Sequence, residues 1–175
     1  MAQEALLKDV EVKDLAKAAI GSFDSASEGS IGSKELAQRM LLRPAEVLES
    51  VPGMVVTQHS GDGKASQYFL RGFNLDHGTD FSVTLDGMPM NMVSHGHAQG
   101  YTNLNVLIPE LLSGIRFRKG PYFLGDGDFS LAGSAALSYV NLLESPFAQV
   151  TVGANQYRRT VLGGSRSHDD QHWLG

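Results

Sequence analysis

Two short segments hold the residues of this sequence that are best suited to chemistry. The first contains Asp76 and His77, and the second contains the tripeptide His95-Gly96-His97. Residues two apart in an extended segment point to the same side, so the imidazoles of His95 and His97 can face one ligand together. Imidazoles suit borderline metals such as Zn²⁺, Cu²⁺ and Ni²⁺. The spacing therefore predicts a metal site on His95 and His97, which His77 or Asp76 completes from the neighbouring segment.

The same histidines have two other interpretations that the sequence leaves open. Their imidazoles can hydrogen-bond to the backbone and fix a Gly-rich loop, or they can contact a sugar or an organic chelate through their N–H groups. An enzyme is less favoured, because the sequence contains no Gly-x-Ser-x-Gly and no His-Glu-x-x-His. A metallohydrolase built from Asp80, His95 and His97 is the main enzymatic alternative. We expect no catalytic residues.

Composition restricts the class of protein further. The 175 residues include 14 Lys and Arg against 19 Asp and Glu, for a formal net charge of −5. This acidic balance, without a basic stripe, argues against a nucleic-acid-binding protein. Cys is absent, which excludes disulfides and thiolate metal sites. A hydrophobic fraction of 42% with 19% charged residues is typical of a globular domain that is long enough to bury a core.

Short helices and strands must position the chemical residues. The hydrophobic pattern predicts three short helices, over 34–41, 44–50 and 104–112. It predicts strands over 54–58, 67–71, 81–85 and 115–118, and a last apolar run over 137–143. Short helices mixed with short strands predict an α+β domain with a small mixed β-sheet.

Composition also divides the chain into three regions. Residues 1–33 are polar and become rich in Gly and Ser, which predicts a flexible arm. Residues 34–145 form the compact part. In residues 146–175 a new alternation of apolar and polar residues predicts one or two strands, which are too few to stand alone. Within the arm, Asp9-Val10-Glu11-Val12 alternates and can pair with a partner's sheet, although a short helix or a frayed terminus also fits.

Four segments, in order along the chain, resemble the plug domain of TonB-dependent outer-membrane receptors. They are 43–54 (RPAEVLESVPGM), 69–73 (FLRGF), 83–91 (VTLDGMPMN), and 108–110 (IPE) together with 115–121 (IRFRKGP). Residues 133–141 (GSAALSYVN) are similar to the family's closing plug strand. One departure is Arg116, which stands where the family usually has an acidic residue. No single segment is specific, but their order over roughly residues 40–145 is.

The resemblance implies an α+β plug inside a transmembrane β-barrel, with residues 146–175 as the first strand or strands of that barrel. A complete barrel of this family needs far more strands, so we expect a plug and a barrel onset here. The resemblance further implies that plug arginines, here Arg71, Arg116 and Arg118, pair with the barrel wall. It places Asp9-Val10-Glu11-Val12 where the family's TonB box pairs with the periplasmic protein TonB.

Members of the family bind substrate at long loops on the outward apex of the plug, which correspond here to residues 73–80 and 90–102. The polar residues that we expect to contact substrate there are Asn74, Asp76, His77, Asp80, Asn91, His95, His97, Gln99 and Tyr101. The resemblance thus predicts the gate of an active importer in the outer membrane of a Gram-negative bacterium. It requires no cofactor, and its cargo is a small molecule, a metal chelate, or Zn²⁺, Cu²⁺ or Ni²⁺. The alternative is a stand-alone periplasmic or surface module that binds a metal or another ligand.

Overall fold

The computed structural model describes residues 21–58, 63–168 and 171–174, and the chain divides into two compact units, Met1–Tyr139 and Val140–Gly175. The elements of the first unit, in chain order, are β1 (Gly21–Phe23), β2 (Glu28–Gly32), α2 (Ser33–Ala37), η1 (Pro44–Ser50), β3 (Met54–Thr57), β4 (Gln67–Leu70), β5 (Phe73–Asn74), β6 (Phe81–Leu85), β7 (Met88–Pro89), η2 (Pro109–Leu111), β8 (Leu112–Lys119) and β9 (Gly133–Tyr139). Those of the second unit are β10 (Phe147–Val152), β11 (Arg158–Gly163), β12 (Ser165–His168) and β13 (Gln171–Leu174).

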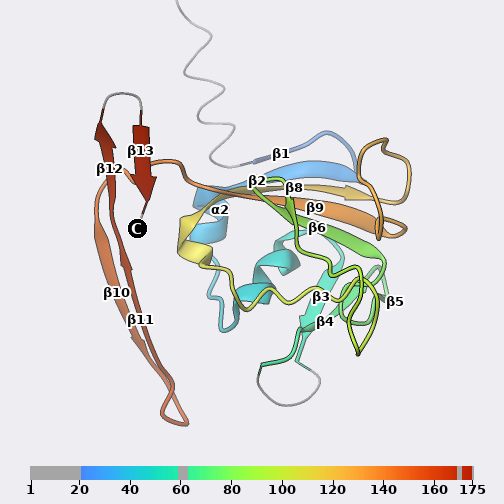
Figure 1. The fold of residues 1–175 in the computed structure, drawn as a ribbon, viewed down its shortest axis with the longest axis horizontal. Helices are drawn as coiled ribbons and strands as arrows, with labels where there is room; N and C mark the ends of the chain where they lie inside the picture. The colour runs from blue at the N-terminus through green and yellow to red at the C-terminus, as the bar shows by residue number, and fades with distance from the viewer. Residues whose placement is uncertain (1–20, 59–62, 169–170, 175) are drawn as a thin grey trace, which may run out of the picture. The chain divides into compact units, whose positions relative to one another are not determined.

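The first unit is built around a six-stranded sheet with the order β1-β2-β8-β9-β6-β7. β6 and β9 are parallel, and the other neighbours in this sheet are antiparallel. β3, β4 and β5 form a separate three-stranded antiparallel sheet. Figure 1 shows this smaller sheet and the short helices on one side of the six-stranded sheet. Mixed sheets with few helices confirm the predicted α+β fold.

One face of the six-stranded sheet is buried, because apolar and polar residues alternate along its central strands. In β8 the side chains of Ile115 and Phe117 are buried, whereas Arg116 between them is exposed. Ala135 and Leu137 continue the buried set in β9. Successive residues of a strand point to opposite faces, so the apolar set turns to the core and the polar set turns outward.

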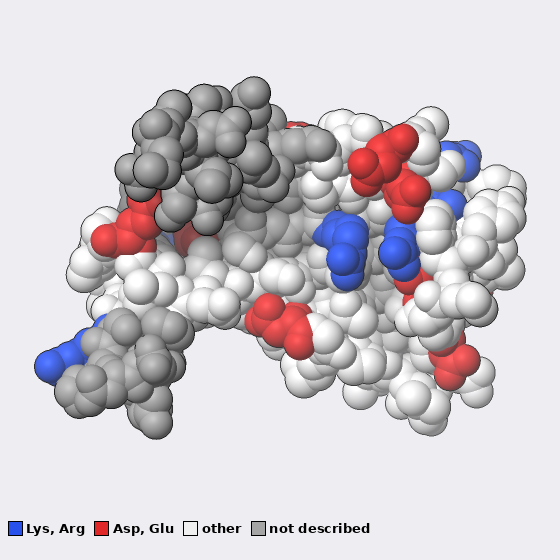
Figure 2. All heavy atoms as spheres, turned by 90° about the horizontal axis from the view of Figure 1, so that it is seen from above, with Lys and Arg blue, Asp and Glu red and all other residues white. Residues whose placement is uncertain are grey.

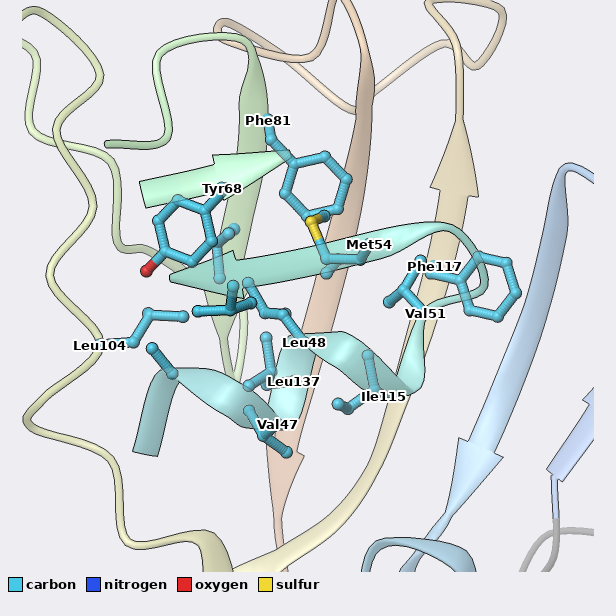
Figure 3. Packing of buried hydrophobic residues seen from close by; sticks show 14 of the residues in the cluster. Val47, Leu48, Val51, Met54, Tyr68, Phe81, Leu104, Ile115, Phe117 and Leu137 are labelled. Atoms are coloured by element: carbon cyan, nitrogen blue, oxygen red, sulfur yellow. The ribbon is translucent and has the colours of Figure 1, made fainter. Parts of the chain in front are cut away.

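The 3₁₀ helix η1 closes this core from the other side. Pro44 occupies its first turn, where the missing backbone N–H of proline costs nothing and its fixed φ favours the helix. Val47 and Leu48 are fully buried. Figure 3 shows them among the other core side chains, which include Tyr68 of β4 and Ile115 of β8. Each such burial stabilises the fold by about 1.5–3 kcal/mol before the entropic cost of ordering is counted.

Residues 21–33 correct the prediction of a flexible arm over residues 1–33. β1 pairs with β2, and β2 pairs with β8, where Ile31 lies opposite Ile115. In this segment glycine allows neighbouring side chains to pack directly against the backbone, so its presence does not indicate flexibility. A Cβ added to Gly29 would lie 3.0 Å from the ring of Phe23 and 3.1 Å from the ring of Phe117. The predicted TonB box, Asp9-Val10-Glu11-Val12, lies outside the described residues.

Three predicted elements are shorter or displaced. The helix predicted over 34–41 ends at Ala37. The helix predicted over 104–112 is reduced to the three residues of η2, and Leu104 and Leu107 are buried in the core from irregular backbone. The last strand of the first unit, β9, begins and ends earlier than the apolar run over 137–143. The sequence therefore showed that these positions are apolar and suited to burial, but it did not predict the backbone conformation at these positions.

The second unit consists of two antiparallel pairs, β10 with β11 and β12 with β13. Val150 lies opposite Thr160 and Ala148 lies opposite Leu162, which places these four side chains on one face of the β10-β11 pair. From Val140 to Arg166, where side-chain burial is described, every residue is half-buried or exposed. In the described part of the whole chain, no helix is long and apolar enough to cross a membrane.

Candidate ligand-binding site

The two loops that the sequence analysis placed at the apex are joined in the structure. Residues 90–102 form an arch that is closed at its base by a β-bridge between Met92 and Tyr101. The N–H of Met92 donates to the carbonyl of Tyr101 (3.0 Å), and the N–H of Gly100 donates to the carbonyl of Met92 (2.8 Å). The N–H of Thr102 donates to the carbonyl of His77 (2.8 Å), which ties the arch to the loop over 73–80.

Asn91 fixes the two loops to each other from below. Its Oδ1 accepts from the N–H of Val83 (2.7 Å), and its Nδ2 lies within 3.0–3.1 Å of the carbonyls of Gly78, Phe81 and Gly100. The side chain is only 9% exposed. Asn91 was expected to contact substrate, but the structure commits its amide to holding backbone. A short amide suits this position because it offers both donors and acceptors to converging strand ends.

His77 is the buried member of the predicted site. Its side chain is 2% exposed, and its Nδ1 lies 2.9 Å from the carbonyl oxygen of Ala65 and 3.2 Å from that of Ser66. A carbonyl accepts but does not donate, so Nδ1 carries a proton. In the tautomer with this proton, the lone pair of an uncharged imidazole is on Nε2, and Nε2 lies 3.6 Å from Oδ1 of Asp76.

The rings of the arch gather around His77 and Tyr101. The ring centroid of His97 lies 4.4 Å from that of His77 and 5.8 Å from that of Tyr101. His95 stacks on Tyr101 with a centroid distance of 4.0 Å and an interplanar angle of 11°. The hydroxyl of Tyr101 accepts from the N–H of Ala65 (2.7 Å), the same residue whose carbonyl holds His77.

The potential metal ligands differ in one member from those that the spacing predicted. Ligand atoms of Asp76, His77 and His97 all lie within 4.8 Å of one another. His95 is not in this group, and its Nδ1 accepts from the backbone N–H of His97 (3.1 Å). The prediction that His95 and His97 point together at one ion does not hold, because the chain turns between them. The acid beside the histidines is Asp76 rather than the Asp80 of the metallohydrolase alternative.

The remaining predicted contact residues lie at the margins of the two loops. Asn74 is exposed, and its Oδ1 accepts from the N–H of Asp76 (2.8 Å) and from Nε2 of Gln67 (3.1 Å). Gln99 is exposed on the arch. Asp80 is half-buried, and its carbonyl accepts from the N–H of Ala132 (2.9 Å). Asn74 thus shapes the turn that presents Asp76, which is a role that the sequence did not reveal.

The three predicted arginines differ in what they contact. Nη1 of Arg118 lies 2.9 Å from Oδ1 of Asp126, and its guanidinium lies 4.6 Å from the ring centroid of Phe123. Arg71 and Arg116 are exposed. Arg116 and Arg118 together line two shallow depressions of about 210 and 220 Å³ on the outer face of the six-stranded sheet. Figure 2 looks at the molecule from above and shows Lys and Arg side chains close together on the face turned to the viewer, with Asp and Glu side chains nearby.

A buried cation beside these arginines was missed by the sequence analysis. Lys119 ends β8 with its side chain 4% exposed, and its Nζ donates to the carbonyl of Pro52 (3.2 Å). Burial, and then the charge of Arg71, lowers the pKa of Lys119. Alternate residues of a strand share one face, so Lys119 lies on the core face together with Phe117. This alternation could have predicted from the sequence that the lysine is buried.

Comparison with known proteins identifies the fold. Residues 23–134, more than half of the 175 residues, match the family model described as TonB-dependent Receptor Plug Domain. Similar solved structures include the copper transporter OprC, the Serratia marcescens hemophore receptor HasR with its hemophore HasA and heme, and the ferric yersiniabactin uptake receptor FyuA from Yersinia pestis.

These three structures are 19%, 24% and 19% identical to the chain, with TM-scores of 0.58, 0.58 and 0.60. The matches cover 81%, 85% and 87% of this chain but only 22%, 23% and 24% of theirs, so the chain spans less than a quarter of their length. At these identities the structural similarity concerns the fold. The match to the family model is decisive, and the chain belongs to the TonB-dependent receptor plug domain family.

Proposed function

We propose that this plug domain is the gate of an active transporter in the outer membrane of a Gram-negative bacterium. It binds its substrate at the loops over 73–80 and 90–102 and signals to TonB through its N-terminal segment. The observation that supports this most is the junction of the two loops. Asn91 and the hydrogen bond from Thr102 to His77 hold them as one surface, on which His95 and His97 are exposed.

The chemistry of this surface agrees with the cargo of the similar proteins. Their names give copper, heme and ferric yersiniabactin as what they carry or bind. All three present either a metal or a metal complex to the protein, and imidazole and carboxylate groups suit such ligands. A metal-containing cargo or another small molecule therefore fits the loops of this plug.

The exposed β10-β11 pair supports the further proposal that it begins a transmembrane barrel. Ala148, Val150 and Leu162 share one face and are exposed. Strands of such a barrel alternate, with apolar side chains turned to lipid and polar ones turned inward. Arg71 and Arg116, which are exposed in the described structure, are then available to the inner wall of the barrel.

The coupling to TonB is tested by breaking strand pairing in the N-terminal segment of the complete receptor. Val10→Pro removes a backbone donor and fixes φ, so it is expected to abolish cross-linking to TonB and TonB-dependent uptake. Ala18→Pro, the same substitution nearby, is the matched control and is expected to leave both unchanged.

Substrate binding is measured separately on the same variants. A receptor whose Val10→Pro variant still cross-links and transports normally would refute the assignment of Asp9-Val10-Glu11-Val12. A complete protein that is recovered from the periplasm rather than from the outer membrane would support the stand-alone ligand-binding module instead.

A further inference from the structure

We propose that Asp76, His77 and His97 form a binding site for a divalent transition-metal ion such as Zn²⁺, Cu²⁺ or Ni²⁺. Their ligand atoms lie within 4.8 Å of one another, although His97 is twenty residues along the chain from His77. The inference rests on the proposed function in one respect only, since it treats the ion, alone or in a complex, as the cargo. Binding of the ion itself is a separate property that can be measured without transport.

The hydrogen bonds of His77 prepare it to bind a metal. Its Nδ1 donates to the carbonyl of Ala65 (2.9 Å), which fixes both the ring orientation and the tautomer. Metal-binding histidines usually donate their second ring N–H in this way, to a carbonyl or a carboxylate. The lone pair of the neutral ring is therefore on Nε2, the nitrogen on the side of Asp76. Because the ring is buried, it offers this nitrogen from a rigid position.

Asp76 is brought beside His77 by an unusual backbone conformation. Its φ is +48°, in the left-handed region where Asp and Asn are tolerated better than most residues. Oδ1 of Asn74 accepts from its N–H at 2.8 Å and stabilises the turn. The carboxylate is half-buried, so it can supply a charged oxygen without the full desolvation cost of burial.

His95 and Tyr101 act as positioning residues in this proposal. Nδ1 of His95 accepts from the N–H of His97, and its ring stacks on Tyr101. Tyr101 in turn accepts from the N–H of Ala65, which holds His77 through its carbonyl. The His-Gly-His tripeptide therefore divides its roles, because one histidine shapes the arch and the other faces the ion.

The donor set determines the class of ion. Two imidazoles and one carboxylate suit borderline divalent ions, whereas Ca²⁺ and Mg²⁺ prefer ligands that are all oxygen. Three protein ligands leave the fourth position of a tetrahedral ion open. His97 is exposed, so that position can be filled by water or by a donor atom of a small chelator. A free ion and a chelated ion are thus two sources of the same ligand chemistry.

The test is a calorimetric titration of the purified complete receptor with ZnCl₂, CuCl₂ and NiCl₂, and in parallel with zinc citrate. His97→Ala removes an exposed ligand, and Asp76→Asn keeps the shape and tolerates the same φ, so neither is expected to unfold the loops. Each is expected to weaken binding on the order of 100-fold, because metal affinity is this sensitive to its coordinating surroundings. Ser94→Ala, at an exposed position of the same arch to which the proposal gives no role, is the matched control and is expected to leave the affinity unchanged.

The outcomes separate the alternatives. Micromolar or tighter binding of a free ion, lost in both ligand variants, supports the site with an ion as cargo. Binding of zinc citrate alone, lost in the same two variants, supports the site with a chelate as cargo. Equal binding by wild type and both variants would overturn the proposal, as would a loss in Ser94→Ala as large as that in His97→Ala. Cross-linking to TonB, measured beside these, reports on the proposed function independently.

Discussion

Leu48 of η1 and Leu162 of β11 are the same side chain in opposite environments. Leu48 is 0% exposed within the core of the first unit, and Leu162 is 72% exposed in the second. Both stand in segments with a clear apolar pattern, so pattern alone does not say whether a partner is present. The first unit supplies its own partners by folding a helix and a small sheet onto one face of its main sheet. The β10-β11 pair has one layer, and a two-stranded sheet by itself is marginal.

The largest expected effect contrasts these two leucines directly. Leu48→Ala should lower the free energy of unfolding of the first unit by roughly 3 to 5 kcal/mol, because it removes buried methyl groups and leaves a cavity. Leu162→Ala, the same change at an exposed position, should stay within about 0.5 kcal/mol. Urea denaturation of the chain measures both, and similar losses in the two variants would show that the second unit has a core of its own.

The second prediction tests whether the exposed face of the β10-β11 pair faces lipid in the complete receptor. Val150→Lys should destabilise the folded receptor in membranes by about 2 to 4 kcal/mol if Val150 lies near the middle of the bilayer. Gln149→Lys, one residue away and on the opposite face, should cost much less. Equilibrium unfolding from lipid vesicles measures the pair, and the reverse order of the two effects would place the faces the other way.

The third prediction concerns the hydrogen bonds of the Asn91 side chain, which hold the two loops of the first unit together. Asn91→Ala leaves the N–H of Val83 and three carbonyls without their amide partner. Unfolding free energy should fall by about 2 to 3 kcal/mol, because buried polar groups lose their hydrogen bonds. Amide hydrogen exchange of Gly100 and Thr102 should also accelerate. Unchanged exchange there would show that the arch is held by its own backbone.

The fourth and smallest prediction compares a buried and an exposed tyrosine. Burial, and then the proximity of Tyr101, raises the pKa of Tyr68 above its ordinary value of about 10. The folded state therefore holds the proton more tightly than the unfolded state, and stability should fall as pH rises above about 10. At pH 8, Tyr68→Phe should cost about 1 kcal/mol, because the hydrogen bond from its hydroxyl to the carbonyl of Thr102 is lost.

By pH 11 this difference between wild type and Tyr68→Phe should shrink by about 1 kcal/mol, since only the wild type carries the group whose ionisation opposes folding. Tyr157→Phe is the control in the second unit, where the side chain is 42% exposed. At pH 8 this variant should stay within about 0.5 kcal/mol of wild type, as is usual for a substitution at an exposed position. Thermal unfolding at the two pH values measures all three proteins, and parallel pH curves for wild type and Tyr68→Phe would contradict the prediction.

Much of the fold follows from local patterns in the sequence. The strands near 54–57, 67–70 and 81–85, and a helix beginning at Pro44, form where alternation and turn residues predicted them. The order of the plug-like segments also identified the family. These features depend on neighbours in the chain, so local sequence specifies them.

What the sequence could not provide depends on residues far apart in the chain. β2 exists because β8 pairs with it, and the Gly and Ser content of residues 21–33 predicted the opposite. Leu104 lies in the core although its backbone is irregular, because burying an apolar side chain is favourable in any backbone conformation.

The candidate site shows the same division between local and tertiary information. Its two loops, and the chemistry of their histidines, were evident from residue types alone. Tertiary structure decides that Asp76 and His77, rather than other residues, lie close to His97. Asn91 holds the two loops together, and the carbonyl of Ala65 fixes the ring of His77. A backbone carbonyl has no signature in the sequence, since every residue carries one. Only folding decides which carbonyl reaches which imidazole, and therefore which ring nitrogen carries the proton.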